Sequence, residues 1–369
     1  MERSVLGVGK GPADRREEPV VGIDVAMSML EITQRNDFPG AGLEAVRRRG
    51  LLSAPFPVAA GGQGWGTEPE GAGTILDLLR RLGRECLSLG RVYEGHVNAV
   101  RLISRYGRAS QIETAAADAR AGHLFAIWDA ERDTAPVRLS GEVLAGRKTF
   151  ASAAGIATRP LVTARRWDGA QQMVLAALRP GQGFGGETLP LHGMRGAHTA
   201  PVCLDGVAAP PDAWIGKPGD YMRQPEISLG AWRTLAVILG GLDALVDAVR
   251  CDMRDRRRDA DRRQLARFGE LVAARETVAL WVGRAAEAAE ARDAGDAAAN
   301  LVKLARIAVD AASLEAIRLA QRAAGLAGFV LPHPVERLAR DLSTYLRQPA
   351  LDEVLEEAGA YFLSAGDPP

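Results

Sequence analysis

The chain has 369 residues, and 46 Lys and Arg residues balance 46 Asp and Glu residues, so its formal net charge is zero. This length predicts two or three domains. The balanced charge argues against a nucleic-acid-binding or membrane-surface protein, and no apolar run approaches the roughly 18 residues of a membrane span. Three scattered cysteines without metal-ligand or redox spacing predict reduced thiols, no metal site and a cytoplasmic protein.

The first third of the chain reads as helical. Residues 1–19 predict a disordered leader, because charges interrupt any apolar centre that a signal peptide would need. Residues 20–118 predict an N-terminal helical domain. It includes a helix that carries Ile75, Leu79 and Leu82 on one face, and a helix from Ser88 to Tyr106.

The middle of the chain, residues 119–222, changes to short extended runs punctuated by Gly and Pro. This pattern predicts a small antiparallel β barrel or sandwich. From 223 to 365 helical spacing returns, and helices with short connections predict an antiparallel four-helix bundle. The expected fold class is therefore α+β multidomain: helical domain, β domain and helical bundle, in this order.

The tail carries the most specific motif, in which a Gln, a Gly-rich corner, a Pro-Val-Glu-Arg helix start and an Arg-Asp pair follow one another. These residues are Gln321, Gly325, Gly328-Phe329, Pro334 to Arg337 and Arg340-Asp341. Their order resembles the C-terminal signature of the acyl-CoA dehydrogenase superfamily. The resemblance implies a bound flavin, with contacts at Gln321, Gly325 and Phe268. It also implies a homodimer or homotetramer that builds the flavin site across a subunit interface.

The β region carries weaker motifs of the same family. The run 146–155 resembles the motif in which a strand residue and a Ser or Thr lie against the flavin ring, which implies Phe150 and Ser152 as contacts. A strand-edge hydroxyl could donate to the flavin, although Ser152 could also be a small residue packed between strands. The family's first β-strand usually contains Thr-Glu and Gly-Ser-Asp. Here the run 126–133 lacks Gly-Ser, and Trp128 takes the Thr position beside the flavin.

Both glutamates that serve the family's dehydrogenases as catalytic base are missing. The first position, counted on from Arg340-Asp341, is Pro349, and the second reads Trp232-Arg233. Removal of an α-proton from an acyl thioester needs a carboxylate. Three acids nearby in sequence could serve, although acids at helix starts more often complement the helix dipole. They are Glu226, Asp352 and Glu353.

A flavin monooxygenase branch of the superfamily uses reduced flavin and oxygen and needs no such glutamate. The chain resembles this branch at Phe150 to Ser152 and at Gly95-His96, which matches a pattern whose His faces the flavin site. The resemblance implies a catalytic role for His96, whose pKa near neutrality suits proton transfer. The alternative is a structural helix histidine. A tail His of the branch is replaced here by Gln348.

Three functions stay open on these observations. The first is a flavin-dependent oxidoreductase acting on CH–CH of an acyl thioester, the second is a reduced-flavin monooxygenase, and the third is a non-catalytic flavin- or acyl-CoA-binding paralogue. FAD is the expected cofactor. FMN or a loosely held reduced flavin are alternatives, because Leu265 replaces an Arg that binds the FAD pyrophosphate in many members. The expected partners are a small substrate such as an acyl-CoA, and a flavin reductase or an electron-transfer partner.

Overall fold

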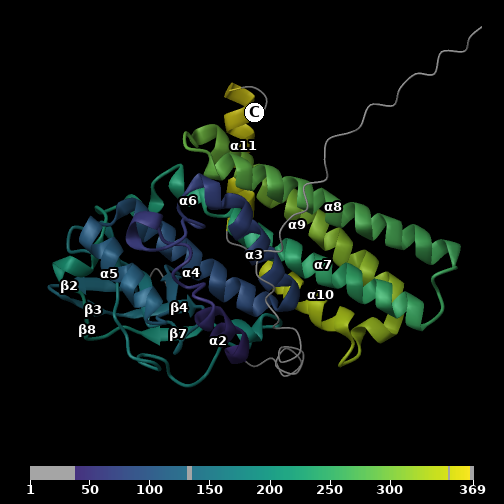
Figure 1. Ribbon diagram of the computed structural model, residues 1–369, viewed down its shortest axis with the longest axis horizontal. Helices are drawn as coiled ribbons and strands as arrows, with labels where there is room; N and C mark the ends of the chain where they lie inside the picture. Colours follow the sequence, from purple (N-terminus) through teal and green to yellow (C-terminus); the bar gives the residue numbers. More distant parts are fainter. Residues whose placement is uncertain (1–37, 131–134, 348–349, 366–369) are drawn as a thin grey trace, which may run out of the picture.

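The computed structural model describes residues 38–130, 135–347 and 350–365, and it has three parts along the chain (Figure 1). Helices come first, then a group of short strands, then a bundle of long helices. The predicted leader at 1–19 lies outside the described residues, as do residues 131–133, Gln348 and Pro349.

The N-terminal part is helical. Its helices are α2 (Gly40–Arg48), α3 (Ala72–Glu85), α4 (Leu87–Tyr106) and α5 (Ala109–Arg120). The apolar stripe of α3 is buried as its spacing predicted. Helix α4 matches the predicted helix from Ser88 to Tyr106, and it has buried residues along its whole length. This burial makes α4 the central helix of the part, against which the β region packs.

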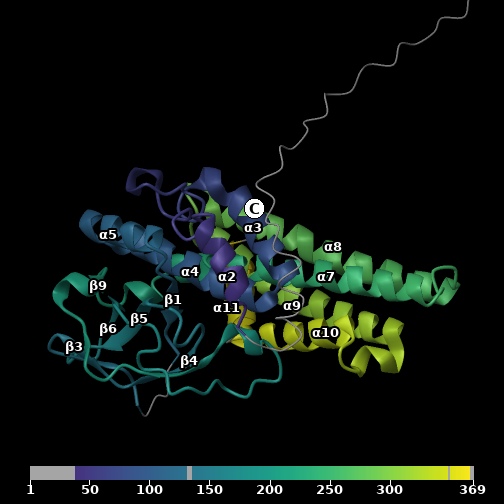
Figure 2. The same cartoon turned by 60° about the horizontal axis from the view of Figure 1, so that its bottom comes forward.

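The β region consists of two sheets that lie together at one end of the molecule (Figure 2). Its strands are β1 (Phe125–Trp128), β2 (Arg138–Ser140), β3 (Val143–Ala145), β4 (Arg147–Ala151), β5 (Arg159–Arg165), β6 (Gln171–Leu175), β7 (Ala200–Cys203), β8 (Val207–Ala208) and β9 (Trp214–Ile215). The larger sheet has the order β8-β3-β2-β5-β6-β9 with β1 also paired to β5, and β4 pairs with β7 in the second sheet.

Most strand pairings are antiparallel, but β1 and β2 each pair with β5 in parallel. Sequence periodicity predicts strands without their partners, so it gave no sign of these two pairings. Strand β4 has a register shift between Lys148 and Ala151. Such irregularities locally disrupt a ladder and redirect side chains, and this one precedes Ser152.

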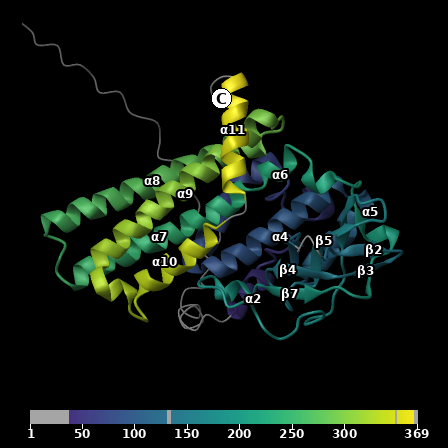
Figure 3. The same cartoon turned by 180° about the vertical axis from the view of Figure 1, so that it is seen from behind.

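The C-terminal part contains α6 (Glu226–Leu229), α7 (Trp232–Asp255), α8 (Arg262–Glu290), α9 (Asp296–Ala324), α10 (Pro334–Tyr345) and α11 (Leu351–Ala365). Helices α7 to α10 lie side by side, and α11 stands across them (Figure 3). Two of these helices begin at side-chain caps. Asp261 accepts hydrogen bonds from the Arg263 and Gln264 amides at the start of α8, and His333 accepts one from Val335 at the start of α10.

Helix α7 of the bundle packs closely against the N-terminal helix α3, with a glycine on each helix at the contact. A Cβ added to Gly83 of α3 would lie 2.3 Å from the Val237 carbonyl oxygen, and one added to Gly240 of α7 would lie 2.0 Å from the Arg80 carbonyl oxygen. No side chain fits at either position, so the two backbones approach as closely as glycine permits.

The predicted fold class, with its helical, β and helical parts in this order, is confirmed. The exact domain boundaries stay a prediction. Within the described ranges, no helix is both long enough and apolar enough to cross a membrane.

Candidate functional site

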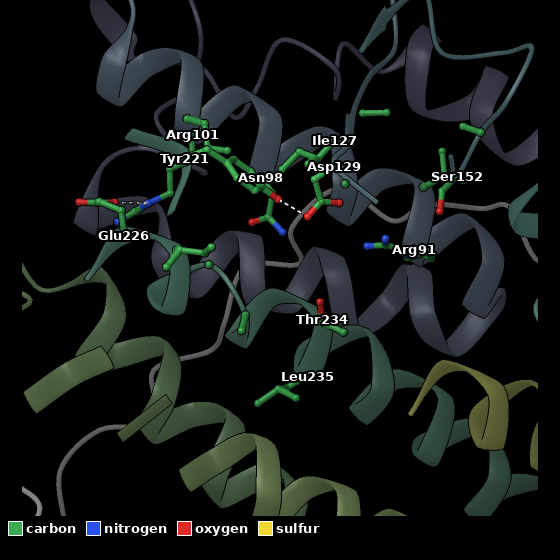
Figure 4. Close-up of a pocket in the computed structure, with 18 of the residues that line it drawn as sticks. Arg91, Asn98, Arg101, Ile127, Asp129, Ser152, Tyr221, Glu226, Thr234 and Leu235 are labelled. Atoms are coloured by element: carbon green, nitrogen blue, oxygen red, sulfur yellow. Dashed lines mark hydrogen bonds and ion pairs between the residues drawn. The ribbon is translucent and has the colours of Figure 1, made fainter. Parts of the chain in front are cut away.

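A cavity of about 290 Å³ lies where the three parts of the molecule meet (Figure 4). Its walls come from α4, from β1 and the residue after it, from the turn that follows β4, from the segment 221–235 and from α9. Five of its lining side chains carry formal charges: Arg91, Arg101, Asp129, Glu226 and Arg306. The site is therefore a junction of elements far apart in sequence, with an unusually charged lining for a small cavity.

Helix α4 contributes one face to the cavity. Arg91, Gly95, Asn98 and Leu102 follow at helical spacing and all line it. A Cβ added to Gly95 would meet no heavy atom within 4 Å. Glycine in a helix interior costs roughly 0.5–1 kcal/mol relative to alanine. Its presence here leaves the middle of the cavity wall flat and open.

Arg91 is held at the cavity by a buried carboxylate. Its Nη1 lies 2.5 Å from Oε2 of Glu94, whose side chain is only 2% exposed. The other Glu94 oxygen accepts hydrogen bonds from Asn98 and, at 3.0 Å, from the Thr234 hydroxyl of α7. Burial opposes the charge on Arg91, but the Glu94 carboxylate outweighs it and raises the pKa of Arg91. The guanidinium is therefore a fixed cation.

Asp129 follows β1 and faces the same cavity. The Tyr221 hydroxyl donates a hydrogen bond of 2.7 Å to Oδ2 of Asp129, and Lys148 donates to the Asp129 backbone oxygen at 3.0 Å. Burial, reinforced by the Asp129 charge, raises the pKa of Tyr221 well above its ordinary value. The phenol therefore stays protonated and orients the carboxylate as a fixed hydrogen-bond donor.

A second buried cluster closes the helical side of the cavity. Arg233 is fully buried and pairs with Glu290 of α8, which also accepts a 2.9 Å hydrogen bond from the Trp232 indole and a 2.7 Å ion pair from Arg101. Burial lowers the pKa of Arg233 to about 10, and Glu290 opposes this shift. The Trp232-Arg233 pair that replaces a family glutamate is thus part of the protein core.

Of the three acids considered as substitute bases, Glu226 is the one that lines the cavity. Its Oε1 lies 3.1 Å from Nε of Arg105 and its Oε2 lies 3.7 Å from Nε of Arg101. Asp352 and Glu353 are exposed in the first turn of α11. Pro349 lies outside the described residues. Glu226 therefore lies where a base could act, but two arginines compensate its charge.

His96 points away from the cavity. It is fully buried; its Nε2 donates to the Leu52 carbonyl oxygen over 2.8 Å, and its Nδ1 accepts the Phe125 amide over 3.2 Å. Burial lowers its pKa to about 4, so the ring is neutral. His96 does not line this cavity, because α4 turns Gly95 and not His96 towards it. That His96 faces the flavin site stays a prediction. A catalytic role for His96 stays a prediction without a cavity contact.

The two predicted flavin contacts of the β strand motif differ in their position relative to the cavity. Ser152 lines the cavity, and its carbonyl oxygen accepts a 2.9 Å hydrogen bond from the buried Trp128 indole. Phe150 is 56% exposed and does not line this cavity. The structure thus brings Ser152 to the site, with Trp128 supporting it from behind.

The predicted contacts of the bundle lie elsewhere. Phe268 packs under the Arg250 guanidinium near the start of α8, and the helix carries it about 33 Å from Glu290. Gln321 and Gly325 lie at the end of α9, where Gly325 has a positive φ of 66°. Arg306 of the same helix lines the cavity, and the helical rise places Gln321 roughly 22 Å further along α9.

Sequence reasoning missed Arg91, Asp129 and Tyr221. The helical spacing from Arg91 to Gly95 could have placed Arg91 beside the site. Tyr221 lies outside any motif, in a short helical turn after β9, and its pairing with Asp129 is a product of the fold. Among the described residues, no cluster of His, Cys, Asp or Glu side chains could hold a metal ion.

Comparison with known proteins gives matches among solved structures. No family model and no curated protein sequence matches the chain. The dibenzothiophene monooxygenase TdsC from Paenibacillus sp. A11-2, solved with FMN and indole, is 19% identical with a TM-score of 0.79, over 92% of this chain and 95% of TdsC. KijD3, solved with FMN and a dTDP-linked amino sugar, is 21% identical with a TM-score of 0.77, over 93% and 91% of the two chains.

Glutaryl-coenzyme A dehydrogenase, solved with glutaryl-CoA, is 20% identical with a TM-score of 0.80, over 93% of this chain and 92% of the dehydrogenase. At these identities the likeness establishes architecture and not chemistry. The match spans nearly the full length of each protein. The chain therefore has the acyl-CoA dehydrogenase fold that its tail motif indicated.

Proposed function

We propose that this chain is a flavin-dependent oxidoreductase, and that it works as a reduced-flavin monooxygenase rather than as an acyl-CoA dehydrogenase. The observation that carries this proposal is the charged cavity, in which Arg91 and the Asp129–Tyr221 pair face a common space beside Gly95 and Ser152. TdsC and KijD3, which share the fold, were both solved with FMN.

The residues present fit a flavin ring. A flavin needs a flat slot and hydrogen-bond donors near its edge, and when bound it supplies the redox chemistry. The open space at Gly95 provides the slot, since no heavy atom lies within 4 Å of an added Cβ. Ser152 and Asn98 supply a hydroxyl and an amide at its border. These three residues would hold the ring.

Other lining residues would bind the substrate and stabilise the negative charge on it. Arg91 offers a cation that does not titrate in the physiological range, so it can hold an oxygen atom that carries negative charge. The free oxygen of Asp129 can take a proton from a bound molecule while Tyr221 keeps the carboxylate oriented. Leu102, Ile127 and Leu235 exclude water from the remaining wall.

An acyl-CoA dehydrogenase is the second candidate, and one observation favours it. Asp129 is a carboxylate at the cavity that could accept an α-proton in place of the missing glutamates. Against this, a saturated acyl chain would have to pack beside Arg91 and Asp129, and desolvation of a charge against hydrocarbon is costly. Glu226 is less available, because its two carboxylate oxygens are engaged by Arg101 and Arg105.

The proposal includes two kinds of partner. A monooxygenase of this type needs a flavin reductase to supply reduced flavin. A second copy of the chain is also expected, because Phe268, Gln321 and Gly325 lie too far from Ser152 to contact the same ring in one chain. If these residues do bind flavin, they would bind a part of it that extends from the partner's cavity.

The test begins with purified protein titrated with FMN and with FAD, with binding followed by quenching of flavin fluorescence. Oxygen consumption is then measured with NADH and a flavin reductase, and bleaching of bound flavin is measured anaerobically with acyl-CoA thioesters. The proposal predicts saturable flavin binding and reductase-dependent oxidation of a substrate. Bleaching by a thioester would favour the dehydrogenase, and flavin binding without either turnover would favour a non-catalytic paralogue.

A further inference from the structure

We propose that His198 is a positioning residue: with its side chain and its backbone it holds the turn 152–155, and it thereby fixes where Ser152 meets the cavity. This inference rests on the proposed function, in which Ser152 borders the flavin ring. It goes beyond that function, because His198 does not line the cavity and acts through another residue. A loop, residues 192–198, carries His198 and contacts this turn at one end and helix α10 at the other.

The turn 152–155 has a backbone conformation that depends on outside support. Ala153 has a φ of 55° and Gly155 has a φ of 77°. The left-handed conformation is unfavourable for alanine, because its Cβ lies too close to a carbonyl oxygen. Such a conformation persists only where the surrounding structure fixes it. Since Ser152 and Ala153 both line the cavity, the shape of this wall depends on the contacts that the turn makes.

Three hydrogen bonds join the turn to the loop. The Ala153 amide donates to the Ala197 carbonyl oxygen over 2.9 Å, and the Ala154 amide donates to the His198 carbonyl oxygen over 3.0 Å. In the opposite direction, Nδ1 of His198 donates to the Ala154 carbonyl oxygen over 3.0 Å. A carbonyl oxygen can only accept, so the proton of this bond belongs to Nδ1. His198 therefore binds both polar backbone groups of Ala154, one with its backbone and one with its side chain.

The His198 ring is itself held between two aromatic side chains. The Phe38 ring meets it edge-on with the centroids 5.8 Å apart, and the Phe184 ring meets it at a tilt with the centroids 5.4 Å apart. Phe184 also covers the turn, because a Cβ added to Gly155 would lie 2.8 Å from Cδ1 of Phe184. Packing on two sides fixes the orientation of the imidazole, so its Nδ1 stays directed at the turn.

The other end of the loop is anchored on helix α10. The Met194 amide donates a buried 2.8 Å hydrogen bond to Oδ1 of Asp341. Gly193 lies so close to α10 that an added Cβ would be 2.4 Å from the Arg340 carbonyl oxygen. The Arg340-Asp341 pair of the tail motif does not line the cavity. It therefore fixes the loop from which His198 reaches the turn.

The backbone at His198 shows which residues can replace it. Its φ of 53° and ψ of 47° are left-handed. Glycine adopts this conformation freely and asparagine tolerates it, whereas alanine does not. The amide nitrogen of asparagine is a donor that branches from Cγ, as Nδ1 of histidine does. Thus H198N keeps the donor and the backbone conformation, H198G keeps only the backbone conformation, and H198A keeps neither.

Hydrogen exchange of the flavin-free protein tests the hold of His198 on the turn. The Ala153 and Ala154 amides are followed by mass spectrometry in a peptide that spans 150–157. H198G and H198A should accelerate their exchange roughly tenfold, because the local opening becomes easier, whereas H198N should stay close to the wild type. His192→Ala removes an exposed histidine of the same loop and is the matched control. It should leave the exchange unchanged.

Titration with FMN then tests whether the position of the turn matters to the ligand. H198G should weaken FMN binding roughly three- to tenfold, because a displaced Ser152 hydroxyl loses its hydrogen bond. It should also shift the absorption bands of bound FMN, and H198N should restore both properties. In a Ser152→Ala background there is no hydroxyl to place, so H198G should change the affinity by less than about twofold.

The outcomes separate this inference from the proposed function. Unchanged exchange in H198G would overturn the inference and leave the flavin function intact; this variant carries no left-handed strain, so it serves if H198A does not fold. Faster exchange with full FMN affinity, or an equal loss of affinity with and without Ser152, would also overturn it, because His198 would then be structural only. Faster exchange in H198G, with no flavin binding by the wild type, would support the hold of His198 on the turn and refute the flavin function.

Discussion

The two faces of helix α4 have opposite chemistry. The cavity face carries Arg91, Gly95 and Asn98, whereas the core face carries Tyr93 and His96, which stack with ring centroids 5.7 Å apart. On the core face the polar atoms bond to backbone groups. On the cavity face Arg91 and Asn98 bond to side chains, namely Glu94 of the same helix and Arg233 of α7. The comparison teaches that one helix anchors the N-terminal domain with one side and shapes a ligand site with the other.

The largest expected loss of stability comes from removing the carboxylate that pairs with a buried arginine beside the cavity. Glu290→Ala leaves Arg233 fully buried without its ion-pair partner. Breaking a buried pair in this way costs about 3–5 kcal/mol. Urea unfolding should show a loss of this size in the free energy of unfolding, together with weaker flavin binding.

Asp243→Ala is the matched control for this variant. Asp243 also joins two arginines to α7, but the Arg80 and Arg275 side chains are 34% and 17% exposed and can reach water. We expect a smaller loss, about 1–3 kcal/mol, with flavin binding intact. Equal losses in the two variants would contradict the view that the cost depends on whether the unpaired arginines can reach water.

His96 should make stability depend on pH through the core face. Its folded pKa of about 4 lies below its unfolded pKa of about 6.5. The unfolded chain therefore binds the extra proton first, so this contribution is complete above pH 6.5 and is lost as the pH falls towards 4. The difference in unfolding free energy between the wild type and His96→Gln should shrink by roughly 3 kcal/mol from pH 7 to pH 4. A difference that stays constant over this range would contradict the buried neutral ring.

Tyr93→Phe tests the core face alone. The Tyr93 hydroxyl donates a buried 2.8 Å hydrogen bond to the Leu51 carbonyl oxygen. Its loss should lower the free energy of unfolding by about 1–2 kcal/mol, measured by urea denaturation. Flavin affinity should not change, and a clear loss of affinity would mean that the two faces are coupled.

Gly95→Ala tests the cavity face and has the smallest effect on stability. Alanine should stabilise α4 by up to about 1 kcal/mol, because it has the higher helix propensity. The added methyl group intrudes on the open slot, so binding of FMN should weaken. Gly283→Ala in α8 also meets no atom within 4 Å but lies away from the cavity. It should give the same gain without the loss of affinity.

The sequence predicted the fold well because the fold depends on periodic burial. The α3 stripe and the α4 boundaries both appear where local patterns placed them. Two parallel strand pairings and the separate second sheet were missed, because partner choice is set by contacts distant in sequence.

The site was less predictable, because its residues meet only in three dimensions. Ser152, which its motif predicted as a flavin contact, lines the cavity, but the neighbouring Phe150 turns to solvent where β4 shifts register. His96 directly follows the cavity-lining Gly95 on α4, and this one position separates the core face from the cavity face. Asp129 and Tyr221 lie 92 residues apart, and no local pattern reports such a pair.

The close contact of α3 and α7 at Gly83 and Gly240 has a mechanical consequence. Two backbones in van der Waals contact through glycines cannot slide or tilt without collision. Helix α3 and the start of α7 therefore move as one rigid unit. The opposite wall is held by a short segment, with the 3₁₀ turn at Asp220–Met222 and the four-residue helix α6. Adjustment to ligands of different size must therefore come from the segment that carries Tyr221 and Glu226, while the helical wall serves as the fixed reference.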